Sequence, residues 1–166
     1  MIDLNSHTTY YNSPIGTLRI TGTSESITAV LFSEEPTVAA SLTPPTCLTT
    51  CVQQLEEYFH KERQTFDLPL QATGTVFQQQ VWKQLQSIAF GKVASYMDVA
   101  RATSGEKAIR AIGAANAKNP ISIVVPCHRV IGSDNSLTGY AWGLWRKEWL
   151  LRHEGYLPAN KQLVLF

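Results

Sequence analysis

The hydrophobic pattern of the chain changes at residues 71–74, and this change limits the folds open to it. Before that point, apolar runs at residues 10–11, 18–20 and 27–31 alternate with polar turns, as in β-strands. After it, apolar residues recur at helical spacing. The sequence therefore predicts an α/β N-terminal unit, a small sheet plus a helix, followed by a mostly helical C-terminal part.

The N-terminal unit is expected to span residues 1–72 and to be structural. Two prolines at 44–45 precede a stretch in which apolar side chains fall near one helical face. These side chains are Leu48, Val52, Leu55 and Phe59. Residues 66–70 are predicted to return as a strand, and residues 71–74 to form a linker.

The second domain is expected to span residues 75–166. Thr75 and Ser95 are predicted helix caps, and Gly105 is a predicted turn between helices at 96–103 and 107–117. Two short helices around such a turn are typical of a winged-helix-like helix-turn-helix, and an ordinary helical hairpin is the alternative. A last helix is predicted at 145–153.

Composition excludes several classes of protein. The chain has 166 residues, of which 44% are hydrophobic and 16% charged, as in a globular protein of one domain or two small ones. No apolar run reaches the about 18 residues that span a bilayer, and the N-terminus lacks a secretory pattern. Three cysteines do not suggest a disulfide scaffold, and Cys47 and Cys51 are interpreted as structural. We expect a cytoplasmic protein without a metal or membrane association.

Charge is divided unequally along the chain. Residues 1–72 hold three basic and eight acidic residues, a net charge of −5, whereas residues 73–166 hold eleven basic and five acidic residues, a net charge of +6. The second part can therefore attract a polyanion, although ordinary surface charge would give the same number.

One thiol stands where it could react. Cys127 follows a β-branched run and Pro126, and His128 comes directly after it. A thiolate is the reactive form of cysteine, and a basic neighbour favours it. Neighbouring side chains in an extended segment point to opposite faces, so the dipeptide alone does not prove contact.

Residues 119–132, which read NPISIVVPCHRVIG, resemble the acceptor-cysteine signature of the 6-O-alkylguanine-DNA alkyltransferases, also called methylated-DNA–protein-cysteine methyltransferases. The resemblance runs from about residue 74 to residue 156. It implies a monomeric DNA-repair protein without a cofactor, which flips an alkylated base out of double-stranded DNA. It also implies irreversible, single-turnover transfer to Cys127 from 6-O-alkylguanine, with 4-O-alkylthymine as a further candidate substrate.

The resemblance also implies roles for other residues of the site. His128 would be the base, acting through a water, and Glu154 would orient it. Tyr96 would donate to the leaving base, and Asn119 would support the active-site turn. The expected substrate pocket contains Val130, Tyr140, Ala141 and Trp142. From the residues alone, Glu154 reads as a carboxylate on a helix surface and each tyrosine as part of the core.

The helix predicted at 107–117 is expected to bind DNA through Lys107, Arg110, Ala111 and Ala114. Its surface is nearly all small residues and holds few side chains that could read bases. The resemblance implies minor-groove docking, with Arg110 filling the space left by the flipped base, and a phosphate contact is the alternative. Trp142 stands where many family members have glycine, and it is predicted to exclude bulky alkyl groups; the alternative is that its indole points away from the pocket and caps the core.

Two other functions are compatible with parts of the pattern. The first is a lesion-binding or helix-turn-helix protein without alkyl transfer, which Cys127 argues against. The second is a cysteine hydrolase, which would turn over.

Overall fold

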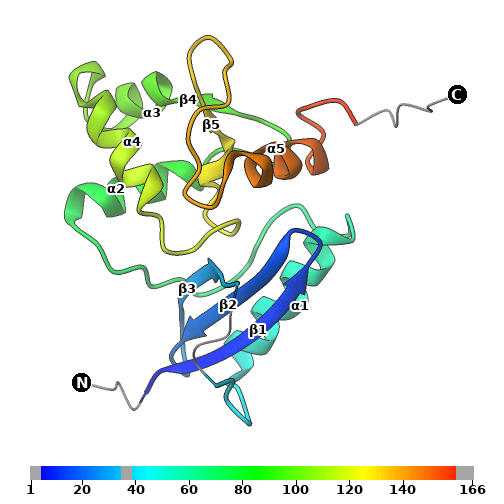
Figure 1. The fold of residues 1–166 in the computed structure, drawn as a ribbon. Helices are drawn as coiled ribbons and strands as arrows, with labels where there is room; N and C mark the ends of the chain where they lie inside the picture. The colour runs from blue at the N-terminus through cyan, green and yellow to red at the C-terminus, as the bar shows by residue number, and fades with distance from the viewer. Residues whose placement is uncertain (1–4, 35–38, 160–166) are drawn as a thin grey trace, which may run out of the picture.

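A computed structural model describes residues 5–34 and 39–159 of the protein (Figure 1). Its N-terminal half holds a three-stranded antiparallel sheet of β1 (His7–Ser13), β2 (Gly16–Gly22) and β3 (Ile27–Phe32), in that order. Buried and partly exposed side chains alternate along β2, because successive residues of a strand face opposite sides. α1 (Thr46–Phe59) packs against the sheet. The three predicted strands and the helix are confirmed.

The outer edge of β3 is covered by segments from farther along the chain. Ile27 bridges Leu70, just before the linker, in parallel orientation. Val30 N donates to Pro120 O and Ser122 N donates to Val30 O, both at 2.9 Å. A strand edge needs partners for its backbone groups, and here the segment leading to Cys127 supplies them. The sheet therefore anchors that segment.

The C-terminal half is mostly helical and lies on the far side of this segment from the sheet (Figure 1). Its α-helices are α2 (Val76–Leu85), α3 (Tyr96–Thr103), α4 (Ile109–Ala117) and α5 (Leu144–His153). The remaining elements are the 3-10 turns η1 (Glu106–Ala108) and η2 (Cys127–Arg129) and a parallel pair of β4 (Ala94–Ser95) with β5 (Val130–Ile131). One cluster of buried apolar side chains extends through both halves.

Local capping explains where two helices begin. The Thr75 side chain accepts from Gln78 N at 3.1 Å, and the Gln78 side chain accepts from Thr75 N at 3.0 Å. Ser95 and Asp98 make the same reciprocal pair at 2.9 Å. Each pair satisfies two backbone donors that a helix start leaves free. Both predicted caps are confirmed.

Three predicted boundaries differ from the structure. The strand predicted at 66–70 is wrong: only Leu70 pairs with the sheet. The helix predicted from Lys107 begins as η1 and becomes α-helical at Ile109, after a turn in which Gly105 has a φ of +90°. The last helix begins one residue early, at Leu144.

The two cysteines of α1 lie against the sheet. Cys51 is fully buried, and burial raises the pKa of its thiol to about 12. Cys47 Sγ donates to Thr23 O at 3.2 Å. Within residues 5–34 and 39–159, no group of three or more His, Cys, Asp or Glu side chains could hold a metal ion. Over the same ranges, no helix is both long enough and apolar enough to span a bilayer.

Candidate active site

Cys127 opens η2 at the end of a tight, buried loop. Asn119 braces this loop through its side-chain amide: Nδ2 donates to Val125 O at 2.8 Å, and Oδ1 accepts from Ile121 N at 3.0 Å. Ile123 has a φ of +72°, a left-handed conformation that is an outlier for a β-branched residue. Such strain persists only where the surroundings over-determine it, and it is common at active sites.

A buried hydrogen-bond network lies directly after the cysteine. Nε2 of His128 is 2.7 Å from Glu154 Oε1. Arg129 donates from Nε to Oε2 and from NH2 to Oε1 of the same carboxylate, both at 2.9 Å. Tyr58 OH, from α1, donates to Oε1 at 2.7 Å. Side chains of α1 and η2, far apart in the sequence, thus converge on one carboxylate at the end of α5, which the sequence interpretation alone would place on a helix surface.

The surroundings fix the charge state of each group. Burial raises the pKa of the Cys127 thiol more than Asn119 and Lys147 lower it, so the resting group is a thiol. Burial also lowers the pKa of His128, which leaves the imidazole neutral at neutral pH. Burial by itself would raise the pKa of Glu154, but His128 and Arg129 hold it well below its usual range. The site therefore pairs a neutral thiol with a neutral imidazole held by a carboxylate.

The tautomer of His128 follows from this pairing. A carboxylate accepts hydrogen bonds, so Nε2 carries the proton that it donates to Glu154. Nδ1 is then the acceptor nitrogen, and it is buried with no hydrogen-bond partner among the described residues. A histidine held in this way can take up a proton at Nδ1.

A cavity of about 270 Å³ opens beside the thiol. Six of the residues predicted for the site line it: Tyr96, Asn119, Cys127, Tyr140, Ala141 and Trp142. Tyr96 OH donates to Thr138 O at 3.0 Å, which ties α3 to the loop before Tyr140. Val130, also predicted for the pocket, is fully buried and does not line the cavity.

Lys147 is a site residue that the sequence analysis missed. Its side chain is fully buried, and Nζ donates to Val130 O at 2.5 Å and to Thr138 O and Gly139 O at 3.2 Å. Burial lowers its pKa to about 8. Lys147 thus holds one end of the cavity loop against β5. Its spacing of three residues before the buried Leu150, which places both on one face of α5, was an available signal.

Asn116 was also missed. Its Nδ2 donates to Cys127 O at 3.3 Å, and its side chain lines the cavity. Its Oδ1 is buried and has no partner among the described residues. Asn116 follows the buried Ile112 by four residues, which places both on the inward face of α4.

The outer face of η1 and α4 carries the four residues predicted to bind DNA. Lys107, Arg110, Ala111 and Ala114 are all exposed, on η1 and α4. Gly113 and Ala117, on the same helix, line the cavity instead. One helix therefore connects an exposed, small-residue surface to the wall of the thiol cavity.

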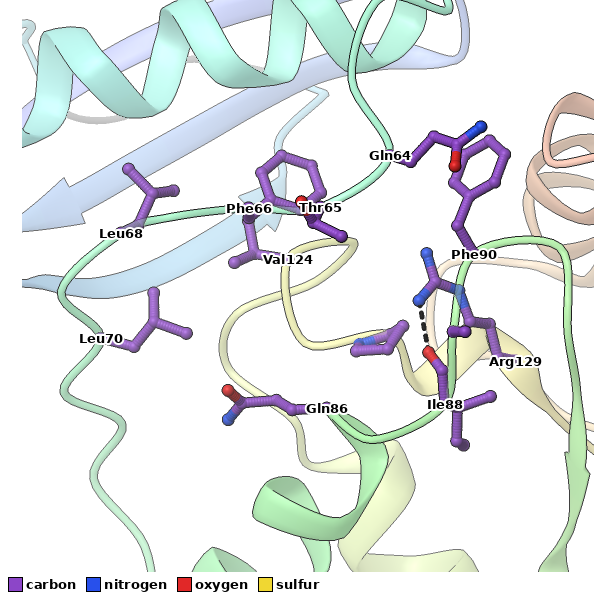
Figure 2. Close-up of a pocket in the computed structure, with 12 residues that line it drawn as sticks. Gln64, Thr65, Phe66, Leu68, Leu70, Gln86, Ile88, Phe90, Val124 and Arg129 are labelled. Atoms are coloured by element: carbon purple, nitrogen blue, oxygen red, sulfur yellow. Dashed lines mark hydrogen bonds between the residues drawn. The ribbon is translucent and has the colours of Figure 1, made fainter.

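A second cavity, of about 290 Å³, is lined by Arg129 of this network (Figure 2). Arg129 reaches its wall, where NH1 donates to Ile88 O at 2.6 Å, the contact drawn as a dashed line in Figure 2. With two further bonds to Glu154, each nitrogen of the guanidinium donates one hydrogen bond, and Arg129 positions that carboxylate.

Both halves of the chain match family models. Residues 76–156 match "6-O-methylguanine DNA methyltransferase, DNA binding domain", and residues 7–72 match "6-O-methylguanine DNA methyltransferase, ribonuclease-like domain".

Individual relatives with the same family name are also similar to this chain. A methylated-DNA–protein-cysteine methyltransferase of Shigella flexneri is 55% identical over 105 residues, which are 63% of this chain and 61% of that protein, less than two thirds of its length. The constitutive methylated-DNA–protein-cysteine methyltransferase of Bacillus subtilis is 44% identical over 145 residues, covering 83% of this chain and 87% of the relative. A crystal structure of Mycobacterium tuberculosis OGT in complex with DNA has a TM-score of 0.80 and 40% identity, covering 93% of this chain and 95% of that one.

Proposed function

Because this chain belongs to the 6-O-methylguanine DNA methyltransferase family, we propose that it repairs DNA by transferring the alkyl group of 6-O-alkylguanine to its own Cys127. One observation carries the assignment of the acceptor. Cys127 is the thiol on the wall of the cavity, and the neighbouring imidazole is buried, neutral and held by a carboxylate. That arrangement suits deprotonation of a thiol by a positioned base.

DNA binding is proposed to use the exposed face of η1 and α4. Small side chains at Ala111 and Ala114 allow the helix to approach the groove walls closely, and Lys107 supplies charge for a phosphate. An alkylated base inside the duplex cannot reach Cys127, so the nucleotide must be extruded. Arg110 is exposed on the same face and is proposed to fill the vacated position.

The transfer step is proposed to begin with the thiol proton. His128 Nδ1 accepts that proton, through a bridging water in the family's pattern, and Glu154 stabilises the resulting imidazolium. The thiolate attacks the alkyl carbon, so a sulfur–carbon bond forms while the bond from that carbon to the base oxygen breaks. The electron pair of the broken bond leaves with the guanine.

Leaving-group stabilisation is proposed to come from the cavity wall. Negative charge develops on the base as the bond breaks, so donors aimed at the base accelerate the step. Tyr96 OH would exchange its bond with Thr138 O for one with the purine, and the backbone N–H of Ala141 would face the departing oxygen. Tyr140 would form the wall against which the base packs.

The product is a stable thioether, and no second nucleophile is proposed to release it. Each monomer would therefore react once, without a cofactor. The proposal is tested by giving the protein an excess of duplex that carries 6-O-methylguanine with a labelled methyl group. The label on the protein should reach a plateau at one methyl per molecule, and Cys127→Ser should take up none while still binding the duplex. Label that accumulates in solution beyond that plateau would instead indicate a hydrolase.

A further inference from the structure

Arg146 joins the N-terminal sheet to the wall of the thiol cavity. It lies on α5, and its side chain crosses to the turn between β1 and β2, where Nε donates to Ile15 O at 2.8 Å. From the other side of the guanidinium, NH1 donates to Trp142 O at 2.9 Å. One side chain therefore bridges two backbone carbonyls that belong to different halves of the molecule.

Packing fixes the guanidinium between these carbonyls. Its central carbon lies 4.5 Å from the centre of the Phe32 ring and 4.6 Å from that of Trp145, both within the range of cation–π contact. Gly16 leaves room for it, because a Cβ at that position would lie 2.9 Å from Arg146 NH2. The Phe32 ring also packs on Trp142, at 5.8 Å between ring centres.

The indole of Trp142 is held at its other end as well. Nε1 donates to the hydroxyl of Ser122 at 3.0 Å. Ser122 is fully buried, and its backbone is bonded to Val30 of β3 at 2.9 Å. Trp142 is thus held through its carbonyl by Arg146, through its ring by Phe32 and through its indole nitrogen by Ser122. Phe32 belongs to β3, and the other two residues are hydrogen-bonded to the N-terminal half.

We propose that Arg146 is a positioning residue that holds Trp142 as a fixed wall of the alkyl pocket and thereby limits the size of the alkyl group transferred to Cys127. The proposal rests on the proposed function. Trp142 lines the thiol cavity, whereas Arg146 does not, so Arg146 acts through the tryptophan. A close-packed wall admits extra volume only at a cost, and a wall that can move admits it more easily. The N-terminal sheet would in this way take part in substrate selection.

The test compares single-turnover transfer from duplexes that carry 6-O-benzylguanine or 6-O-methylguanine. Arg146→Met keeps the length of the side chain but removes both hydrogen bonds. We expect it to raise the benzyl-to-methyl rate ratio by about tenfold, which corresponds to about 1.4 kcal/mol. Arg146→Lys should give an intermediate ratio, because a single ammonium lacks the planar fork that bridges two carbonyls.

A double-variant cycle separates positioning from general destabilisation. In a Trp142→Gly background there is no indole to hold, so Arg146→Met should leave the ratio unchanged. Arg63→Met is the matched control, because Arg63 also makes two hydrogen bonds, to Glu57 and Thr65, but at residues that do not line the thiol cavity. Arg63→Met should leave the benzyl-to-methyl rate ratio of the native protein unchanged.

Two results would overturn the proposal: an unchanged ratio in Arg146→Met, or a shift of equal size in the Trp142→Gly background. Either result would leave the proposed function standing as long as the native protein transfers methyl groups. Absence of methyl transfer by the native protein would instead count against the proposed function itself. Thermal unfolding of each variant shows whether it is folded at the assay temperature.

Discussion

Nε2 of His128 lies 2.7 Å from Oε1 of Glu154, and neither side chain is exposed to solvent. The two residues come from η2 and from the C-terminal end of α5, so their contact requires the folded C-terminal half. It directs the Nε2 proton of the imidazole to the carboxylate and leaves Nδ1 as the nitrogen that can accept a proton.

The first prediction concerns the pH dependence of transfer. Burial lowers the pKa of His128 below 6.5, the usual value of histidine, so the base stays neutral until the solution is more acidic than that. Single-turnover rates measured between about pH 5 and pH 8 should show an acidic limb whose midpoint lies below 6.5. The variant His60→Gln, which removes an exposed histidine, should keep the same midpoint. A midpoint above 6.5 would mean that the imidazole is not held in its neutral form.

The lowered pKa of His128 also makes the free energy of unfolding depend on pH in one direction. The pKa of His128 is lower in the folded protein than in the unfolded chain, so between the two values only the unfolded chain binds the proton. The free energy of unfolding should therefore fall as pH decreases through 6.5. Denaturant titrations at several pH values measure this free energy. In His128→Gln, the free energy of unfolding should depend less on pH between the folded and unfolded pKa values of the histidine.

The second prediction concerns Lys147, whose charge lies near the thiol. Burial lowers its pKa to about 8, so the ammonium is present at neutral pH, where it favours the thiolate of Cys127. Lys147→Met should raise the pKa of the thiol and slow transfer by roughly tenfold to a hundredfold. The rate of iodoacetamide labelling against pH reports the thiol pKa directly. Lys83→Met, at an exposed position on α2, is the control. If Lys147→Met leaves the labelling profile unchanged, the charge of Lys147 does not affect the pKa of the Cys127 thiol.

The third prediction separates extrusion from chemistry. Arg110→Ala should slow repair in duplex DNA by about tenfold to a hundredfold, because unstacking a base costs a few kcal/mol that a filling side chain offsets. Reaction with the free modified base needs no extrusion and should be unaffected. Lys107→Ala removes one charge from the same surface and should not slow duplex repair at saturating protein. Equal losses on duplex and free base would assign Arg110 another role.

The fourth prediction concerns the mode of DNA binding. With few base-reading side chains on α4, affinity should be nearly independent of sequence and should fall steeply as salt rises. If Lys107 contacts a phosphate, Lys107→Ala should reduce the slope of log affinity against log salt by about 0.9. Fluorescence anisotropy with two unrelated undamaged duplexes measures both quantities. Strong preference for one undamaged sequence would argue for a regulator instead.

Local signals were sufficient for the framework of the fold. The reciprocal bonds at Thr75 and Ser95 depend only on residues three positions away, so the two helix starts could be predicted from the sequence. The strand predicted at 66–70 failed because only Leu70 finds a partner on β3. Pairing across a sheet depends on the tertiary approach of another segment, which a local pattern does not contain.

The candidate site was only partly predictable for the same reason. Cys127 and His128 are adjacent in the sequence, and the remaining roles came from resemblance to a family. Lys147 and Arg146 look like surface charges on α5, beside Glu148. Their importance arises from carbonyls at Val130 and Ile15 that folding brings to them. Such contacts between distant segments leave no local sequence pattern.

Transfer of the alkyl group to Cys127 is tested most directly by locating that group on the protein. The native protein is incubated with duplex that carries 6-O-methylguanine, digested, and analysed by mass spectrometry. We expect the peptide containing Cys127 to gain the mass of one methyl group in place of a hydrogen, while the peptides with Cys47 and Cys51 stay unmodified. The Cys127→Ala variant should yield no adduct and should still bind the duplex. An adduct on another residue, or demethylated DNA without any protein adduct, would show that Cys127 is not the acceptor.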